Sequence, residues 1–287
     1  MSRLILNADD FGLTAGINRA IGELAAAGAL TSATLMASGP AFDDAVAVAR
    51  AHPALGVGCH IVLTDGVPIS PPASIPSLIG PDGKSFHPTL AGFMSALLRG
   101  RIRSEDISRE TLAQIQKLQK ADINVTHIDT HKHTHIFSGV ALPVLHAARL
   151  AGVHAVRNPF EPAWSASLSH GTLRRRIAVR LLNRMRPHIQ ALIQLENQPV
   201  LTTDGTIAIS ATGDLTSTTL AEILAALPSA GTFELCCHPG YNDADLDRIA
   251  TRLRAHRDRE REALLAEIPR LLTQPNAPTL ISYSDLR

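Results

Sequence analysis

The chain has 287 residues, a length that suits a single α/β barrel. It is 45% hydrophobic and 18% charged, which fits a globular protein with a sizeable core and argues against global disorder. The 27 basic and 26 acidic residues nearly cancel to a formal charge of +1, so no global field recruits nucleic acid and no nucleic-acid partner is expected.

The cellular location is predicted from what the sequence lacks and from its cysteines. We find no apolar leader with a small-residue cleavage site and no apolar run of ~18 residues, so neither a secretory signal nor a membrane-spanning helix is expected. The three cysteines, Cys59, Cys236 and Cys237, make no disulfide framework and are expected to be small buried hydrophobes in strands. A cytoplasmic protein is predicted, either free or peripheral on the inner face of the membrane.

Strands and helices alternate along the chain. The first strand is predicted at residues 3–8, and the helix after it carries Ile17, Ala20, Ile21 and Leu24 on one face and ends near Gly28. The later predictions, in chain order, are a strand at 31–37, a helix from about 40 to 51, strands at 55–63 and 125–131, a helix near 139–150, and strands at 153–157, 233–237 and 279–283.

Repeated strand–helix units indicate a parallel sheet, either doubly wound or closed into a barrel. Neither a glycine-rich dinucleotide fingerprint nor a Walker loop follows the first strand. Two stretches interrupt the alternation and are too long for ordinary connections. Residues 65–104 are rich in Pro, Gly and Ser and are expected to form a loop or lid, and residues 159–199 contain an arginine-rich helical insertion. We expect one domain, 1–287, with these two insertions.

Polar residues follow the first and third predicted strands. Asp9 and Asp10 stand at the exit of the first strand, where burial of a carboxylate without a partner is costly. One alternative is a turn in which an aspartate caps the next helix. The third strand ends in His60, on a face otherwise lined by glycine, which suggests that another group approaches the backbone there. A hydrogen-bonded core histidine is the alternative.

The fourth predicted strand carries the strongest signal. A period of two places His127, Asp129 and His131 on one face, and His133 and His135 continue this stripe if the chain stays extended. So many ionisable side chains suit a metal or acid–base site better than a core. The alternative is a solvated edge strand or a non-specific histidine-rich tract.

A further histidine, His238, leaves a later strand and begins a His-Pro-Gly turn. In a closed α/β barrel the C-terminal strand ends meet on one face, so Asp9, Asp10, His60, His131 and His238 can converge. One aspartate and two histidines form an open 2-His-1-carboxylate set, typical of a catalytic metal. The remaining aspartate and histidine can then serve as base and acid.

Five segments make the sequence resemble the YdjC-like family of carbohydrate deacetylases. They are NADDFG at 7–12, GCHIVLT at 58–64, THIDTHKHTH at 126–135, HPGY at 238–241 and LISYSDL at 280–286. Within that family the sequence is most similar to the hopanoid-biosynthesis-associated HpnK type. The supporting segments are ALTSATLMASGPAFDDAV at 29–46, GPDGKSF at 80–86 and VRNPFEPAW at 156–164.

The resemblance implies a distorted TIM-like barrel, one divalent metal and removal of an N-acetyl group from an amino sugar. By motif position, Asp10, His60 and His131 would hold the metal, with Asp9 as general base and His238 as general acid. Zn²⁺ is favoured, with Ni, Co, Mn, Fe or Mg as alternatives. One departure is Lys132, where some relatives carry a further histidine. Substrate-binding or supporting roles are assigned to Asn7, Thr64, His127, Asp129, His133, Arg157 and Tyr241.

The substrate and the arginine-rich segment leave alternatives open. The leading prediction is an N-acetylglucosamine-bearing hopanoid glycolipid, and the first alternative is a chito-oligosaccharide. A two-metal phosphoesterase and a non-catalytic metal- or sugar-binding protein are lesser alternatives.

Residues 173–193 have an apolar stripe of Leu173, Ile177, Leu181 and Leu182 with arginines largely outside it. Such a helix can lie on an anionic membrane, or it can cover the barrel or form a homodimer contact.

Overall fold

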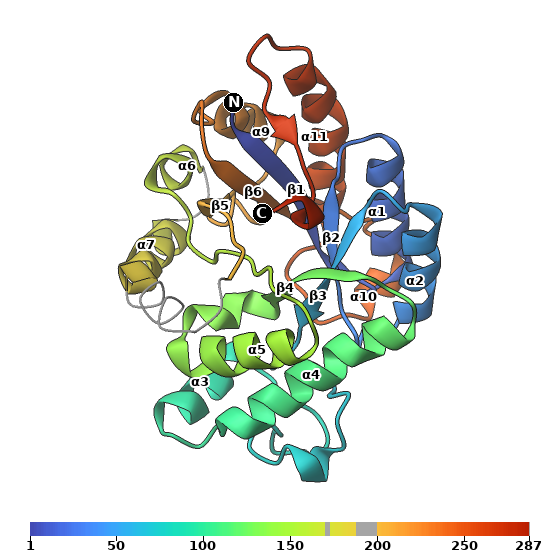
Figure 1. Ribbon diagram of the computed structural model, residues 1–287, viewed down its shortest axis with the longest axis vertical. Coiled ribbons are helices and arrows are strands. Elements are labelled where there is room, and N and C mark those ends of the chain that lie inside the picture. The colour runs from blue at the N-terminus through green and yellow to red at the C-terminus, as the bar shows by residue number, and fades with distance from the viewer. Residues whose placement is uncertain (170–172, 188–199, 287) are drawn as a thin grey trace.

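The computed structural model describes residues 1–169, 173–187 and 200–286, with the backbone alone at 173–176. Parallel strands form one curled sheet in the order β4-β3-β2-β1-β6-β5, and β7 also pairs with β1 (Figure 1). The strands are β1 (Arg3–Phe11), β2 (Ser32–Leu35), β3 (Gly56–Ile61), β4 (Val125–Thr130), β5 (Gly205–Ile207), β6 (Thr232–Cys237) and β7 (Thr279–Leu280). The predicted α/β class is confirmed, in the form of a half-barrel.

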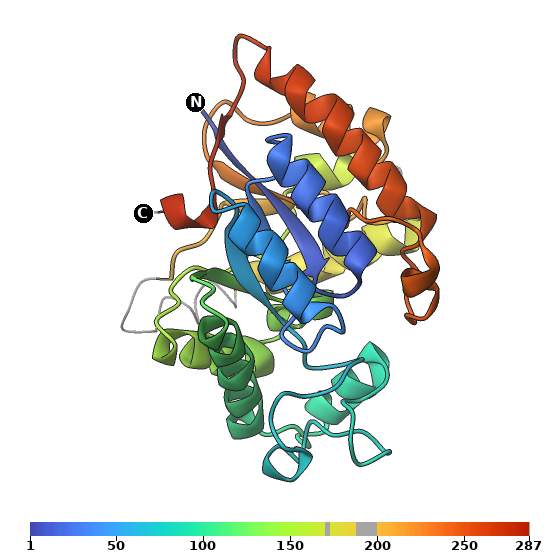
Figure 2. The ribbon, with the colours of Figure 1, turned by 90° about the vertical axis from the view of Figure 1, so that its right-hand side faces the viewer.

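Helices cover the outside of this half-barrel. The even positions Leu4, Leu6 and Ala8 of β1 belong to the main apolar core beneath the helices, whereas Asn7 and Asp9 contact polar partners on the concave side. Figure 2 shows α1, α2 and α11 lying side by side on one outer flank. The helices that cover the sheet are α1 (Ala15–Ala26), α2 (Phe42–Ala51), α4 (Ser104–Lys120), α5 (Ser138–Leu150), α9 (Ser217–Ala225) and α11 (Ala255–Leu272), and the short α10 (Ala244–Asp247) precedes α11.

Closure into a full barrel is not seen in the described residues. The predicted strand at 153–157 is reduced to isolated bridges, in which Val156 pairs with Ile128 of β4 and Ala155 pairs with Leu201. The predicted last strand at 279–283 stops at Leu280, and the short helix η4 (Tyr283–Asp285) follows. Ser282 and Asp285 form a capping box that favours this helix over a longer strand.

The stretch 65–104 is more ordered than the predicted loop. It contains η1 (Pro72–Ser74) and α3 (Leu90–Leu98). Its side chains Ile75, Leu78, Phe86 and Phe93 are buried, so the segment contributes to the apolar core. Glu110 of α4 holds the beginning of this stretch in place, because its carboxylate accepts hydrogen bonds from the backbone amides of residues 69 and 70.

Part of the arginine-rich stretch is also described, as α6 (Ala163–Leu168), α7 (Leu173–Leu182) and η3 (Asn183–Met185). The predicted apolar stripe divides between two faces. Leu182 packs against the cluster of Ile136 and Phe160, whereas Ile177 and Leu181 are 47% and 52% exposed. Leu173 and the end of the predicted helix, 188–193, lie outside the described side chains. No helix within the described ranges is long and apolar enough to cross a membrane.

Candidate active site

A β-bulge at the end of β1 lets two adjacent aspartates serve the same site. Consecutive residues of a regular strand point to opposite faces. Here the pairing of β1 with β2 shifts register between Ala8 and Phe11, and Asp10 takes a left-handed backbone with φ of 64°. Bulges re-aim side chains next to active sites. Asp9 and Asp10 are accordingly both buried, yet each has a different arginine as its partner.

Asp9 belongs to a buried ion-pair network, which we call the interior network: Arg157 with the carboxylates of Asp9, Asp129 and Glu234. Arg157 donates to both oxygens of Asp9, at 2.6 Å and 2.8 Å, and its Nη1 lies 2.5 Å from Asp129 Oδ2. Its Nε and Nη2 reach Glu234 Oε1 at 2.8 Å and 2.6 Å. A guanidinium that is fully buried needs such partners, because an unpaired charge in the interior is very costly.

The interior network fixes the charge of its members. Burial alone would raise the pKa of Asp9, but the Arg157 charge and hydrogen bonds outweigh it and hold this pKa well below its usual range. Arg157 and His60 likewise lower the pKa of Asp129 against the effect of burial. Glu234 is the exception, because burial raises its pKa despite Arg157. Asp9 therefore remains an oriented carboxylate at neutral pH.

Asp10, His60 and His131 make up a second group, the mouth cluster. Asp10 Oδ1 lies 3.6 Å from His60 Nε2 and 3.5 Å from His131 Nδ1. The two imidazole nitrogens are 3.3 Å apart. His60 and Asp10 are buried, while the His131 side chain is 20% exposed, so the cluster opens on one side. The three predicted metal ligands, from β1, β3 and the end of β4, are thus brought together.

The orientation of His60 is set by groups behind it. Its Nδ1 lies 2.7 Å from Asp129 Oδ1, which directs Nε2 toward Asp10 and His131. The Thr34 hydroxyl lies 3.2 Å from the same Nδ1. Burial would lower the pKa of His60, but Asp129 and the two aspartates of β1 raise it to about 9. A carboxylate behind a histidine is the usual outer partner of a metal-binding imidazole.

The mouth cluster fits a divalent metal. Ligand bonds of about 2.0–2.2 Å in a tetrahedral arrangement separate the donor atoms by about 3.3–3.6 Å, and the three observed separations are 3.3 Å, 3.5 Å and 3.6 Å. Two other groups of potential ligands are Asp9, His60 and Asp129, and Asp9, Cys236 and His238. Their carboxylates are already bound by Arg157, and burial raises the pKa of the Cys236 thiol. The mouth cluster is therefore the best metal site among the described residues.

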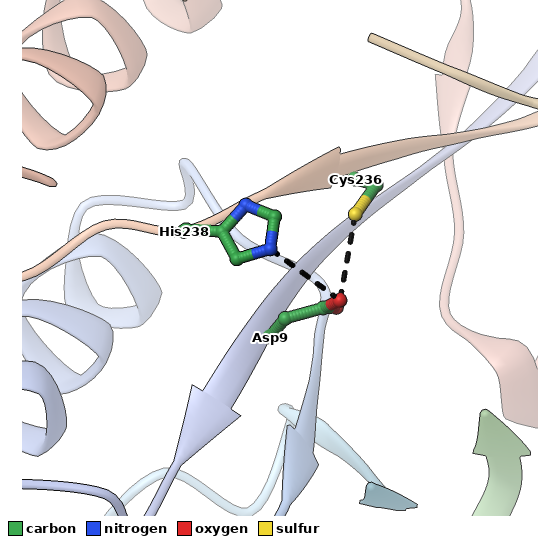
Figure 3. Close-up of side chains that lie close together, drawn as sticks. All are labelled: Asp9, Cys236 and His238. Atoms are coloured by element: carbon green, nitrogen blue, oxygen red, sulfur yellow. Dashed lines mark hydrogen bonds and ion pairs between the residues drawn. The ribbon is translucent and has the colours of Figure 1, made fainter. Parts of the chain in front are cut away.

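His238 approaches Asp9 from β6 (Figure 3). Its Nε2 lies 3.8 Å from Asp9 Oδ2, and the Cys236 thiol lies 3.5 Å from the same oxygen. The His238 backbone donates to Glu260 of α11 at 2.6 Å, and its Nδ1 has no hydrogen-bond partner among the described residues. The side chain is 12% exposed, so this imidazole reaches the surface of the site beside a buried carboxylate.

The predicted extended stripe ends at His131. There the chain enters the short helix η2 (His131–Ile136), in which Lys132 and His133 adopt left-handed backbones with φ of 57° and 51°. His135 turns back, and its Nδ1 pairs with Thr130 Oγ1 at 2.6 Å. Burial and the Arg157 charge lower the pKa of His133 to about 3. Lys132 forms a 2.6 Å ion pair with Asp65 at the rim.

Asn7 and His127 lie deeper in the concave side. Asn7 Nδ2 donates to Asp9 Oδ1 at 3.2 Å, and His127 Nε2 lies 3.2 Å from Asn7 Oδ1. The His127 ring stacks on Tyr283 with 3.7 Å between the centroids. A Cβ at Gly58 would lie 2.5 Å from the His127 ring, which explains the glycine-lined face of β3. These residues support the interior network from below.

Two predicted site residues form their hydrogen bonds away from the interior network and the mouth cluster. The Thr64 hydroxyl donates to the His87 carbonyl at 2.9 Å, which ties the end of β3 to the stretch 65–104. The Tyr241 hydroxyl donates to Glu23 of α1 at 2.8 Å, and its ring lies between two arginines, Arg19 and Arg261. Neither side chain has a described contact with the mouth cluster, so their predicted substrate roles stay predictions.

Sequence reasoning missed several buried polar residues of the site. Arg257 is the clearest case, because its Nη2 lies 2.5 Å from Asp10 Oδ2 although it is far away in sequence. The sequence did contain a signal for Glu234, because a single acidic residue within an otherwise apolar strand indicates a buried carboxylate that needs a partner. No helix and no site residue was predicted in the segment that forms α11. The missed residues are Thr34, Glu234, Arg257, Glu260 and Tyr283.

Polar side chains at the C-terminal ends of parallel strands are the arrangement that α/β-barrel enzymes use for their active sites. A family model described as YdjC-like protein matches residues 3–273, and the chain belongs to this family. A carbohydrate deacetylase of Brevibacillus brevis is 33% identical over 84% of this chain and 82% of its own length. One from Geobacillus stearothermophilus is 33% identical over 84% of this chain and 81% of its own.

A solved structure from Enterococcus faecalis has the same fold. It is named as a candidate cellobiose-phosphate cleavage protein, is 25% identical in sequence, and superposes with a TM-score of 0.75 over 98% of this chain and 97% of its own. The predicted relationship to the YdjC-like family is thus confirmed. The narrower HpnK-type resemblance stays a prediction.

Proposed function

We propose that this protein is a metal-dependent carbohydrate deacetylase that hydrolyses the acetamide of an N-acetylglucosamine-type sugar. The observation that carries the proposal is the mouth cluster, whose three donor atoms lie 3.3–3.6 Å apart beside the separate, ionised Asp9. The two relatives named as carbohydrate deacetylases support the same reaction class.

Asp10, His60 and His131 are the proposed metal ligands, with Zn²⁺ favoured and Ni, Co, Mn, Fe or Mg as alternatives. A divalent ion bound there supplies Lewis acidity toward the acetamide carbonyl and makes nearby water easier to deprotonate.

Asp9 is the proposed general base. Arg157 grips both of its oxygens and so fixes the plane of the carboxylate, while Oδ2 remains on the side of His238. Asp9 takes a proton from the attacking water, whose oxygen forms the new bond to the acetyl carbon. Its lowered pKa makes Asp9 a weak base, so a divalent ion held by the mouth cluster would have to supply the acidity of the water.

His238 is the proposed general acid. Its imidazole Nε2 lies 3.8 Å from Asp9 Oδ2 and the side chain is 12% exposed, so it is proposed to reach the sugar nitrogen. When the C–N bond breaks, His238 donates a proton to this nitrogen, and acetate and the free amine leave. Lys132 and Asp65, which form an ion pair, are proposed to contact the sugar, and the buried His133 is proposed to support the site.

A two-metal phosphoesterase is not favoured by this geometry. It would need a second ion about 3.5–4 Å from the first. The carboxylates available for such an ion, Asp9 and Asp129, are held by Arg157 at 2.5–2.8 Å. A non-catalytic sugar-binding protein would leave the pairing of Asp9 with His238 without a role.

The aglycone of the sugar is proposed to be a hopanoid lipid, with a chito-oligosaccharide as the alternative. The exposed Ile177 and Leu181 of α7 lie one helical turn apart, with the exposed Arg180 between them. An apolar pair flanked by basic side chains suits the surface of an anionic membrane. This peripheral contact, or a homodimer contact through the same helix, belongs to the proposal only.

The test is acetate release by protein loaded with Zn²⁺. The substrates are an N-acetylglucosaminyl lipid in vesicles and N-acetylated chitobiose, and His131→Ala is the control variant. We expect acetate from at least one of them, and its loss in His131→Ala together with the metal. Release from the lipid alone selects the hopanoid branch. No acetate from either substrate, with full metal occupancy, would refute the proposed reaction.

A further inference from the structure

Arg257 connects helix α11 to the mouth cluster. It lies in the first turn of the helix, and its side chain is 1% exposed. Its Nη2 donates to Asp10 Oδ2 at 2.5 Å, and its Nε donates to the Leu253 carbonyl at 3.1 Å. A Cβ at Gly240 would lie 3.1 Å from the Arg257 Cδ atom, so the glycine after the His-Pro pair leaves room for this side chain.

We propose that Arg257 is a positioning residue that makes Asp10 a metal ligand through one oxygen only. This inference rests on the proposed metal site. Arg257 takes Oδ2, and the other oxygen, Oδ1, is the atom that faces His60 Nε2 at 3.6 Å and His131 Nδ1 at 3.5 Å. The carboxylate therefore presents one donor atom to the cluster in a fixed orientation.

Asp10 needs such a partner more than an ordinary ligand does. Its left-handed backbone, with φ of 64°, is uncommon for a residue with a side chain, and the bulge leaves it outside the regular ladder. The carboxylate is also buried, so it pays a desolvation cost that Arg257 offsets.

The neighbouring aspartate shows the opposite arrangement. Arg157 takes both oxygens of Asp9, so the guanidinium fixes this carboxylate in the interior network rather than in the mouth cluster. Arg257 takes one oxygen of Asp10 and leaves the other free. The two arginines thus assign adjacent aspartates to different tasks, the base in one case and the ligand in the other.

The experiment measures the affinity for Co²⁺ alone, by competition with a chelating dye, without any substrate. Arg257→Met keeps the apolar stem and removes the donor. We expect its Kd for Co²⁺ to rise about 10–100-fold, the usual effect of losing an outer partner of a metal ligand. Arg257→Lys should recover part of the affinity. Combining Arg257→Met with Asp10→Asn should add almost nothing to the effect of Asp10→Asn alone.

Arg261→Met is the matched control. Arg261 follows one turn later on α11, but its Nη1 pairs with Glu23 of α1 at 3.1 Å and has no described contact with the ligands. This variant should lower the stability and leave the Kd for Co²⁺ unchanged, with urea unfolding of both metal-free variants recorded in parallel. An unchanged Kd in folded Arg257→Met, or equal losses in both variants, would overturn the inference.

Failure of the proposed function gives a different result. If the wild-type protein binds no Co²⁺, then the metal site itself is wrong and the inference falls with it. If the wild type binds Co²⁺ but releases no acetate, only the reaction is refuted. If Arg257→Met does not fold, Arg257→Lys decides, because a wild-type Kd despite the shorter, single-headed cation would contradict the positioning role.

Discussion

The interior network and the mouth cluster lie next to each other and are joined by the contact between Asp129 and His60. Their carboxylates nevertheless have different kinds of partner. In the interior network every carboxylate is bound to Arg157, which is fully buried. In the mouth cluster the three donor atoms face one another at 3.3–3.6 Å, and one histidine is partly exposed. The first region is held together by a buried cation of the chain itself, whereas the second presents three potential ligand atoms on a side that is partly open.

This difference teaches how one strand end supplies two kinds of carboxylate. The change from Asp9 to Asp10 is a single residue, but the bulge and the left-handed φ of Asp10 turn the second side chain to another partner. The proposed base and the proposed metal ligand therefore stand next to each other with different arginines as partners. Mutations in the two regions should separate stability from metal binding.

The largest effect on stability is expected from Arg157→Met. Removing the guanidinium leaves three buried carboxylates without their cation, and breaking a buried network in this way costs about 3–5 kcal/mol. Urea unfolding of the metal-free protein measures the loss. Arg257→Met, which leaves a single carboxylate unpaired, should cost clearly less. Equal losses of unfolding free energy in the two variants would contradict the proposed difference between the interior network and the mouth cluster.

The next effect concerns turnover. Asp9→Asn should lower kcat by about 10²–10⁴-fold, because it removes the proposed general base, while the metal content stays near that of the wild type. Asp10→Asn should weaken metal binding by more than about tenfold, because it removes one donor atom. Acetate release and metal content are measured on the same preparations. The reverse pattern would exchange the roles of the two aspartates.

Much of this site follows from the sequence, because the relevant signals are local. Period-two alternation placed Asp129 and His131 on one face, and strand–helix alternation brought them to the same edge as Asp9 and His60. The three cysteines are buried free thiols, as predicted. These predictions needed only the geometry of strands and the rule that parallel strand ends converge.

The rest depends on tertiary contacts that no local pattern carries. The bulge arises from the pairing of β1 with β2, which are separated by a helix in the sequence. The different orientations of Asp9 and Asp10 could therefore not be predicted from these two adjacent residues alone. No prediction was made for Arg257, and its burial against Asp10 depends on a contact between residues that are far apart in the sequence. The histidine stripe was extended too far, because η2 begins at His131.

His127, which lies beneath the interior network, is expected to make the free energy of unfolding depend on pH. Burial lowers its pKa to about 3, from 6.5 in the unfolded chain. Between these values the unfolded state binds a proton that the folded state does not, so stability rises with pH and is lost as the pH falls below 6.5. At pH 5 this histidine alone costs about 2 kcal/mol relative to pH 7.5.

His127→Gln tests this assignment, because glutamine stays neutral at every pH in this range. Urea unfolding of both proteins at pH 7.5 and pH 5 should show a smaller acid loss in the variant. Some loss will remain, because burial also lowers the pKa of His133 and His135, to about 3 and about 4. An identical acid loss in both proteins would show that His127 is not the titrating group.

The smallest effect on catalysis is expected far from both regions, on α7. Reversing Arg180 and Arg184 to Glu should leave turnover of a small soluble acetamido sugar unchanged, because both side chains are exposed and neither has a described contact with the site. Binding to anionic vesicles should weaken, since each basic residue near such a surface contributes about 1 kcal/mol. High salt should mimic the variant in the wild type by screening. If subunit assembly or soluble turnover changes while vesicle binding does not, the helix is a dimer contact or part of the catalytic surface, and the membrane role is wrong.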